Sequence, residues 1–139
     1  EKPADPGQVC TVVMVNSESI SNADASSGPY AASKAALRVM AAALAHEVRG
    51  SQAAVASLML GPLANPDKRD QLARVAANKT MDVADVTRLF LRKSNPNLVI
   101  DDLLEFDDCL VCIDAVKALG AAANGMVCRL DGGAGGSLT

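Results

Sequence analysis

The stretch SESISNADASSGPYAASK, residues 17–34, joins a polar loop to the start of a helix and carries the only tyrosine of the chain. Lys34 follows Tyr30 by four residues, about one helical turn, so the phenol and the ammonium share one helix face. Ser17 lies where an apolar run ends, and the loop that follows can bring its hydroxyl back toward that face. A hydroxyl, a phenol and a lysine near one point predict a site that moves a proton on or off a carbonyl oxygen.

The segments on either side of this stretch predict a parallel sheet covered by helices. Residues 9–16 form a nearly continuous β-branched run, typical of a strand buried on both faces. Residues 30–48 are rich in alanine and have high helix propensity. Residues 53–60 are a second apolar run, which Gly61 ends. A strand, a helix and a strand in this order predict a right-handed βαβ unit, whose ligands bind at the carboxyl ends of the strands.

The alanine-rich helix has two possible neighbours. Apolar residues recur in it at spacings of three and four, and we expect this stripe to pack on the sheet. Its members are Leu37, Met40, Leu44 and Val48. The many alanines would also permit another helix to approach closely. The sequence leaves open whether that helix belongs to another subunit or whether residues 30–48 are simply a tightly packed internal helix.

The rest of the chain predicts further helices and one more strand. Segments with helical spacing of apolar residues are 67–77, 83–93 and 102–119. Acidic residues at the start of the last segment favour the helix dipole. We expect its inward-facing stripe to consist of Leu103, Phe106, Leu110, Ile113, Val116 and Leu119. A short apolar run at 126–130 predicts the last strand, and glycines dominate the tail to residue 139.

These elements predict one incomplete domain over residues 1–139. Its parts are a leader loop at 1–8, the strand–helix–strand unit with its polar triad at 9–64, a variable segment at 65–101, and the last helix, strand and tail at 102–139. A half sheet leaves an open edge and an uncovered face, which a globular protein has to hide. We therefore expect a homo-oligomer, or a partner chain that covers the open sheet.

Composition excludes several classes of function. A net charge of -3 and an aromatic content of 2% provide neither a basic nor a stacking surface, so we expect no nucleic-acid partner. No apolar run approaches the roughly 20 residues that a membrane span needs, so we expect no membrane partner. The four cysteines are scattered through apolar segments, which predicts free thiols and an intracellular reducing compartment, the cytoplasm or an organelle matrix.

Several of these features together resemble the carboxyl half of a short-chain dehydrogenase/reductase. They are Ser17, the run YAASK at 30–34, the alanine-rich helix, the strand that ends near Gly61, and the last strand, which ends in Asp131-Gly132-Gly133. The resemblance covers nearly the whole chain. It implies an α/β fold with a partial doubly wound, Rossmann-like parallel sheet, made of three strands with flanking helices and without the amino-terminal nucleotide-binding half.

The resemblance also implies an NAD(P)-dependent oxidoreductase that transfers hydride to or from a small carbonyl or alcohol substrate. Tyr30 would be the general acid or base, and Ser17 would bind the substrate oxygen. Lys34 would favour the phenolate and hold the nicotinamide ribose. Gly61 and Asn65 would lie beside the nicotinamide of NAD or NADP, with Asn65 at about the position of the threonine that is usual in the family.

Departures from the family support an alternative. Nothing in the sequence matches the glycine-rich turn that places a cofactor pyrophosphate at a helix N-terminus, and the asparagine of the family's proton relay cannot be assigned. The expected enzyme therefore needs a missing cofactor-binding half, encoded upstream or carried by another chain. The alternative is a non-catalytic structural or interaction subunit of a larger assembly, in which Ser17 caps a turn and Tyr30 fills a crevice.

Three further groups have structural explanations simpler than their functional ones. His46 is expected on the solvated side of its helix rather than as a catalytic base. Cys109 and Cys112 have the spacing of a metal or redox pair, but a helical apolar pattern around them favours core thiols. An acidic cluster is expected to form a solvated helix start rather than a cation site; its members are Asp101, Asp102, Glu105, Asp107 and Asp108.

Overall fold

The computed structural model of the chain describes residues 9–23 and 26–135. The predicted leader at 1–8 and the last residues of the predicted tail lie outside this range. The elements in chain order are β1 (Cys10–Ser17), η1 (Glu18–Ile20), α1 (Gly28–Glu47), β2 (Ala53–Leu60), α2 (Pro66–Lys79), α3 (Val83–Ser94), α4 (Phe106–Ala118), η2 (Gly120–Ala123) and β3 (Val127–Leu130).

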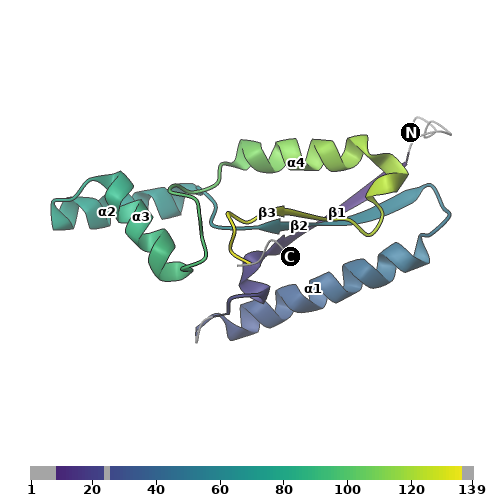
Figure 1. The fold of residues 1–139 in the computed structure, drawn as a ribbon, viewed down its shortest axis with the longest axis horizontal. Coiled ribbons are helices and arrows are strands. Elements are labelled where there is room, and N and C mark those ends of the chain that lie inside the picture. The colour runs from purple at the N-terminus through teal and green to yellow at the C-terminus, as the bar shows by residue number, and fades with distance from the viewer. Residues whose placement is uncertain (1–8, 24–25, 136–139) are drawn as a thin grey trace.

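Three parallel strands form one open sheet in the order β1-β2-β3, with α1 on one face and α4 on the other (Figure 1). The register pairs Ser17 at the end of β1 with Leu60 at the end of β2, and Leu60 in turn with Leu130 of β3. Because the strands are parallel, their carboxyl ends meet at one edge. The predicted partial doubly wound α/β sheet is confirmed.

The central strand β2 supplies the core of both layers. Successive side chains of a strand point to opposite faces. Val55 accordingly packs with Ala41 and Ala45 of α1, whereas Leu58 packs with Cys109 of α4. The prediction of a strand at 53–60 is confirmed to the residue.

The prediction that the first strand is buried on both faces is wrong. Val12 and Val15 of β1 are 43% and 45% exposed. In the described part of the chain β1 pairs with β2 alone, so one of its edges and part of its surface stay open. A continuous apolar run predicts a strand that is buried inside a wider sheet. Among the described residues, β1 is instead an edge strand of a three-stranded sheet.

The stripe predicted for α1 is wrong at one position. Met40 is 56% exposed, whereas Ala41 and Ala45 are 5% and 7% exposed. Leu44 and Val48 pack beside these alanines, as expected. Because each residue turns a helix by about 100°, the sheet-facing positions are 41, 44, 45 and 48, and Met40 lies outside them. The small alanine side chains let α1 lie close to the sheet.

The last helix begins four residues later than predicted. Leu104 forms a parallel bridge with Leu63, and Glu105 caps α4 in a capping box with Asp108. Residues 102–105 therefore run in an extended segment that helps join α2 and α3 to the sheet.

The inward stripe of α4 also differs from the prediction. Phe106, Leu110 and Leu119 are each about half exposed. The residues that face the sheet are Cys109, Cys112, Ile113 and Val116. The prediction was right for Ile113 and Val116, and Cys109 and Cys112 pack in the core as their apolar surroundings predicted.

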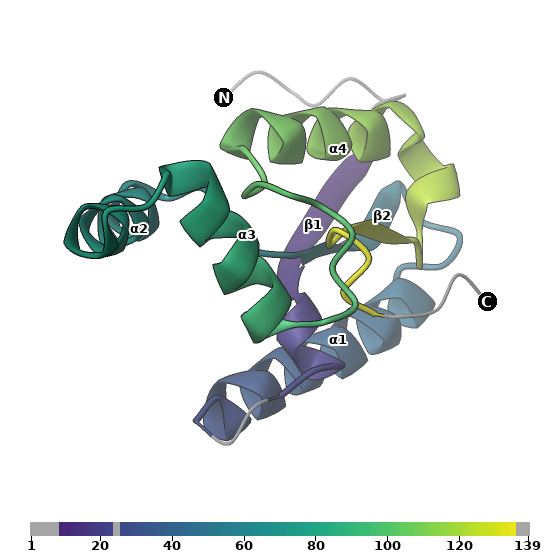
Figure 2. The ribbon, with the colours of Figure 1, turned by 60° about the vertical axis from the view of Figure 1, so that its left-hand side comes forward.

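Helices α2 and α3 lie beyond the carboxyl ends of the strands (Figure 1) and enclose their own apolar cluster with Leu72, Val86 and Leu91. The end of α3 returns to the loop after β1 (Figure 2), where Asn22 Nδ2 donates to the Ser94 carbonyl at 3.3 Å. The variable segment thus reaches the carboxyl edge of the sheet. No helix in the described ranges is both long and apolar enough to cross a membrane.

Candidate functional site

Ser17 lies at the last position of β1, on the carboxyl edge of the sheet. Its Oγ is 3.0 Å from Ser19 Oγ and accepts a hydrogen bond from the Ser19 backbone N–H at 3.2 Å. The side chain therefore caps η1, the short helix that follows. A hydroxyl can donate and accept at once, so the cap leaves Ser17 able to bind a further oxygen.

Tyr30 and Lys34 lie in the first turns of α1, as the spacing predicted. Lys34 Nζ is 5.7 Å from the centre of the Tyr30 ring, a distance at which a cation is attracted to the ring face. Tyr30 is 50% exposed, so its phenol is accessible from solvent. The structure therefore brings these two side chains together.

Two hydrogen bonds tie this helix to the end of β1. Lys34 Nζ donates to the Val15 carbonyl at 3.3 Å, and Asn16 Nδ2 donates to the Lys34 carbonyl at 3.1 Å. Asn16 Oδ1 also accepts from the Ser17 N–H at 2.8 Å. Asn16, which is 3% exposed, thus holds the Ser17 strand end against the Lys34 helix turn. Asn16 was not predicted as a site residue, although it is a lone amide at the end of an apolar strand.

Gly61 follows β2 directly and allows two strand ends to approach closely. Its N–H donates to the Leu130 carbonyl at 2.9 Å. A Cβ at this position would lie 2.9 Å from the Asp131 backbone oxygen, a contact that Cβ atoms essentially never make. Gly61 therefore has a structural reason to be glycine, and it lies on the same edge of the sheet as Ser17.

Asn65 has a structural role that was not predicted. It is the N-cap of α2, where its Oδ1 accepts from the Lys68 N–H at 2.8 Å. Pro66 fills the first helical position, and the pair is a common helix start. The signal was present as Asn65-Pro66 before a helical segment. The cap uses the amide oxygen and leaves the Nδ2 donors for another partner.

A second unpredicted residue, Glu18, lies beside Ser17. Its Oε2 is buried and has no hydrogen-bond partner in the structure. Burial, and then the nearby Asp131 carboxylate, raise the pKa of Glu18 above its usual range. Asp131 is 7% exposed and accepts hydrogen bonds from Arg129 and from the Gly133 N–H. The side-chain carboxyl groups of Glu18 and Asp131 therefore both lie near the edge that the carboxyl ends of the strands form.

The other sequence candidates make other contacts. His46 is exposed on α1, beside Arg49. All four cysteines are free thiols, and burial raises the pKa of both Cys109 and Cys128. Within the acidic cluster, Asp101 and Glu105 form ion pairs with arginines. Among the described residues, no group of three His, Cys, Asp or Glu side chains could hold a metal ion.

Comparison with known proteins gives matches among solved structures only. No protein-family model and no curated protein matches the sequence. A short chain dehydrogenase family protein from Francisella tularensis is 16% identical, with a TM-score of 0.71 over 91% of this chain and 51% of that chain. The actinorhodin polyketide ketoreductase with NADPH is 15% identical, with a TM-score of 0.72 over 93% and 48%. Sorbitol-6-phosphate 2-dehydrogenase from Erwinia amylovora is 21% identical, with a TM-score of 0.65 over 88% and 47%.

These matches establish the fold of the chain. Its three parallel strands and flanking helices resemble part of a Rossmann-like short-chain dehydrogenase/reductase domain. The chain spans about half the length of each of these structures. The resemblance predicted from the sequence is thereby confirmed at the level of the fold.

Proposed function

We propose that this chain is the proton-transfer half of an NAD(P)-dependent oxidoreductase of the short-chain dehydrogenase/reductase type, acting on a small carbonyl or alcohol. The observation that carries the proposal is the Tyr30–Lys34 pair, held by Asn16 against the strand that ends in Ser17. Ligands of open α/β sheets bind at this edge. The fold is one that NADPH-bound reductases share.

Each residue of the site has its own role in the reduction of a carbonyl substrate. Ser17 donates a hydrogen bond to the carbonyl oxygen and stabilises the negative charge that develops there. Tyr30 donates its phenolic proton to that oxygen as the carbonyl carbon is reduced, so that an alcohol and a tyrosinate result. Lys34 Nζ, 5.7 Å from the ring centre, stays beside the tyrosinate until solvent returns the proton. In the oxidation of an alcohol the same protons move in reverse.

The donors at this edge fit the nicotinamide end of a cofactor. A lysine ammonium has three N–H donors, and the Val15 carbonyl takes one of them. The remaining two are suited to ribose hydroxyls, and Asn65 Nδ2 is suited to the nicotinamide amide. When bound, the cofactor supplies or accepts the hydride.

The pyrophosphate end of the cofactor has no such fit in the described residues. A glycine-rich turn at a helix N-terminus is the usual cradle, and the sequence contains no match to it. We propose that this part comes from outside these 139 residues or from a partner chain. The open edge of β1, where Val12 and Val15 are exposed, would be where that part joins the sheet.

The test is to replace the one tyrosine. Tyr30→Phe should lower the turnover of a carbonyl or alcohol substrate at least about a hundredfold, because the acid/base group is lost. Cofactor affinity should change little, since Lys34 remains. Ser33→Ala is the matched control: Ser33 lies in the same turn and its hydroxyl donates to the Tyr30 carbonyl at 2.7 Å, so turnover should persist. Equal turnover in Tyr30→Phe and the unmodified protein would refute the proposed role.

A further inference from the structure

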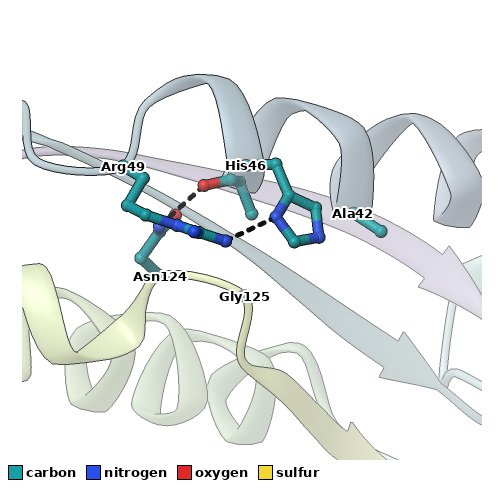
Figure 3. A pocket seen from close by; sticks show the side chains of 6 residues that line it. Ala42, His46, Arg49, Asn124 and Gly125 are labelled. Carbon is teal, nitrogen blue, oxygen red and sulfur yellow. Dashed lines mark hydrogen bonds between the residues drawn. The ribbon is translucent and has the colours of Figure 1, made fainter.

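A polar hollow lies at the amino-terminal edge of the sheet, at the other end of the strands from Ser17 (Figure 3). It has a volume of about 280 Å³ and opens between the end of α1 and the turn before β3. Its lining residues are Ala42, Ala45, His46, Arg49, Asn124 and Gly125. The proposed proton transfer uses none of them.

Hydrogen bonds within the protein fix the wall of the hollow. Asn124 Nδ2 donates to the Ala45 carbonyl at 2.8 Å, and its Oδ1 accepts from the Val55 N–H at 3.1 Å. The Gly125 N–H donates to the Val55 carbonyl at 2.8 Å. Asn124 therefore connects α1 to β2 and has a structural role. The other side-chain donors that line the hollow are those of His46 and Arg49.

His46 and Arg49 together present N–H groups to a ligand. Arg49 Nη2 lies 2.8 Å from His46 Nδ1 (Figure 3). A guanidinium can only donate, so His46 Nδ1 accepts and the ring proton lies on Nε2. The further N–H groups of Arg49 and the Nε2–H of His46 are then available donors. Arrays of planar guanidinium donors match the oxygens of phosphate.

The positive charge beside this hollow is not neutralised within the described residues. The ion pairs among the described residues involve four arginines and one lysine. Neither Arg38 nor Arg49 takes part in any of these ion pairs. Arg38 lines a smaller hollow of about 100 Å³, which shares Ala42 and Gly125 with the first. Two arginines that form no ion pair among the described residues therefore border two adjoining hollows, together called the groove below, in a chain whose net charge is -3. Such a groove attracts an anion.

We propose that this groove binds a phosphorylated small molecule, with the phosphate on Arg49 and His46 and the remainder directed along α1 toward Arg38. The volume is near the lower end of ligand pockets. The site is separate from the carboxyl edge and does not depend on the proposed oxidoreductase activity. A different explanation of Arg49 is that its positive charge offsets the helix dipole at the end of α1. That role needs no ligand, so a measurement of phosphate binding distinguishes the two explanations.

The test is a calorimetric titration of the protein, in the form in which it occurs, with inorganic phosphate. The ionic strength is held constant, because a change in salt concentration by itself alters the interactions of exposed charges. We expect saturable binding that Arg49→Gln weakens about tenfold or more, through loss of a charged hydrogen bond. Arg74→Gln is the control, since among the described residues Arg74 also lacks an ion pair and bonds only the Asp70 carbonyl. The absence of saturable binding, or equal weakening in both variants, would overturn the proposal.

Two further measurements cover the remaining outcomes. Ala42→Leu should block binding by filling the wall that both hollows share, while its neighbour Ala43→Leu, exposed elsewhere on α1, should not. Both substitutions suit an exposed helix position, so folding should persist. Phosphate binding that NADP competes away and that Arg49→Gln leaves intact would belong to another site, and that result would also contradict the proposal.

Discussion

At the scale of single residues, Glu18 makes the stability of the protein depend on pH. Its folded-state pKa is raised, chiefly by burial, so the folded protein prefers the protonated carboxyl group. Stability attributable to Glu18 is therefore greatest below the pKa of the unfolded chain, about 4.3. It falls as pH rises through the raised value, because the unfolded state then releases its proton more readily.

Glu18→Gln should therefore stabilise the protein at pH 7. Glutamine resembles the protonated acid, and the expected gain is about 1 kcal/mol or less, because the group is only half buried. The gain should vanish near pH 4. Chemical denaturation at the two pH values measures it, and a gain that is the same at both would show that charge is not the cause.

The sequence could predict those site residues whose spacing is fixed by one helix. Tyr30 and Lys34 share a face because four residues make a turn, and the structure has them adjacent. The partners of Glu18 and Asn16 were not predictable in this way. Asp131 is more than a hundred residues from Glu18 along the chain, and only the register of the sheet brings their regions together.

At the scale of elements, the helix α1 shows which face of an alanine-rich helix carries the core. Ala41→Leu should destabilise the protein by about 1–3 kcal/mol, because the added carbons overpack the contact with Val55. Met40→Leu, one residue away but 56% exposed, should change the free energy of unfolding by less than about 0.5 kcal/mol. Thermal or denaturant unfolding measures both. A larger effect at Met40 would restore the originally predicted stripe.

The positions of the helices and strands in the sequence were largely predictable, but which face of each helix is buried was not. A run of β-branched residues marked β1, an apolar run marked β2, and Gly61 marked the end of the second. The burial of a helix face depends on how closely the helix approaches the sheet. In α1 and α4 that approach is set by small residues, Ala41 and Cys109 among them, which hydrophobicity alone ranks below leucine and methionine.

At the scale of the whole molecule, the open side of the sheet predicts a cover over β1. If a partner or further chain buries Val12 and Val15, then changing both to lysine should cost about 1–3 kcal/mol or more in the free energy of unfolding of the protein as it occurs. Val99→Lys is the control, since Val99 is 78% exposed in a loop. Dependence of the loss on protein concentration would identify the cover as a separate chain. A cost no greater than that of the control would mean that β1 faces solvent.

The central claim is that this chain handles the proton of a hydride transfer, and isotope labelling tests it most directly. The protein, in the form in which it occurs, would be incubated with NADPH that carries deuterium at the transferable position and with a panel of small ketones and aldehydes. The account predicts that deuterium appears on the carbinol carbon of the product and that Tyr30→Phe prevents this while NADPH still binds. Absence of transfer to every carbonyl, or undiminished transfer in Tyr30→Phe, would contradict it.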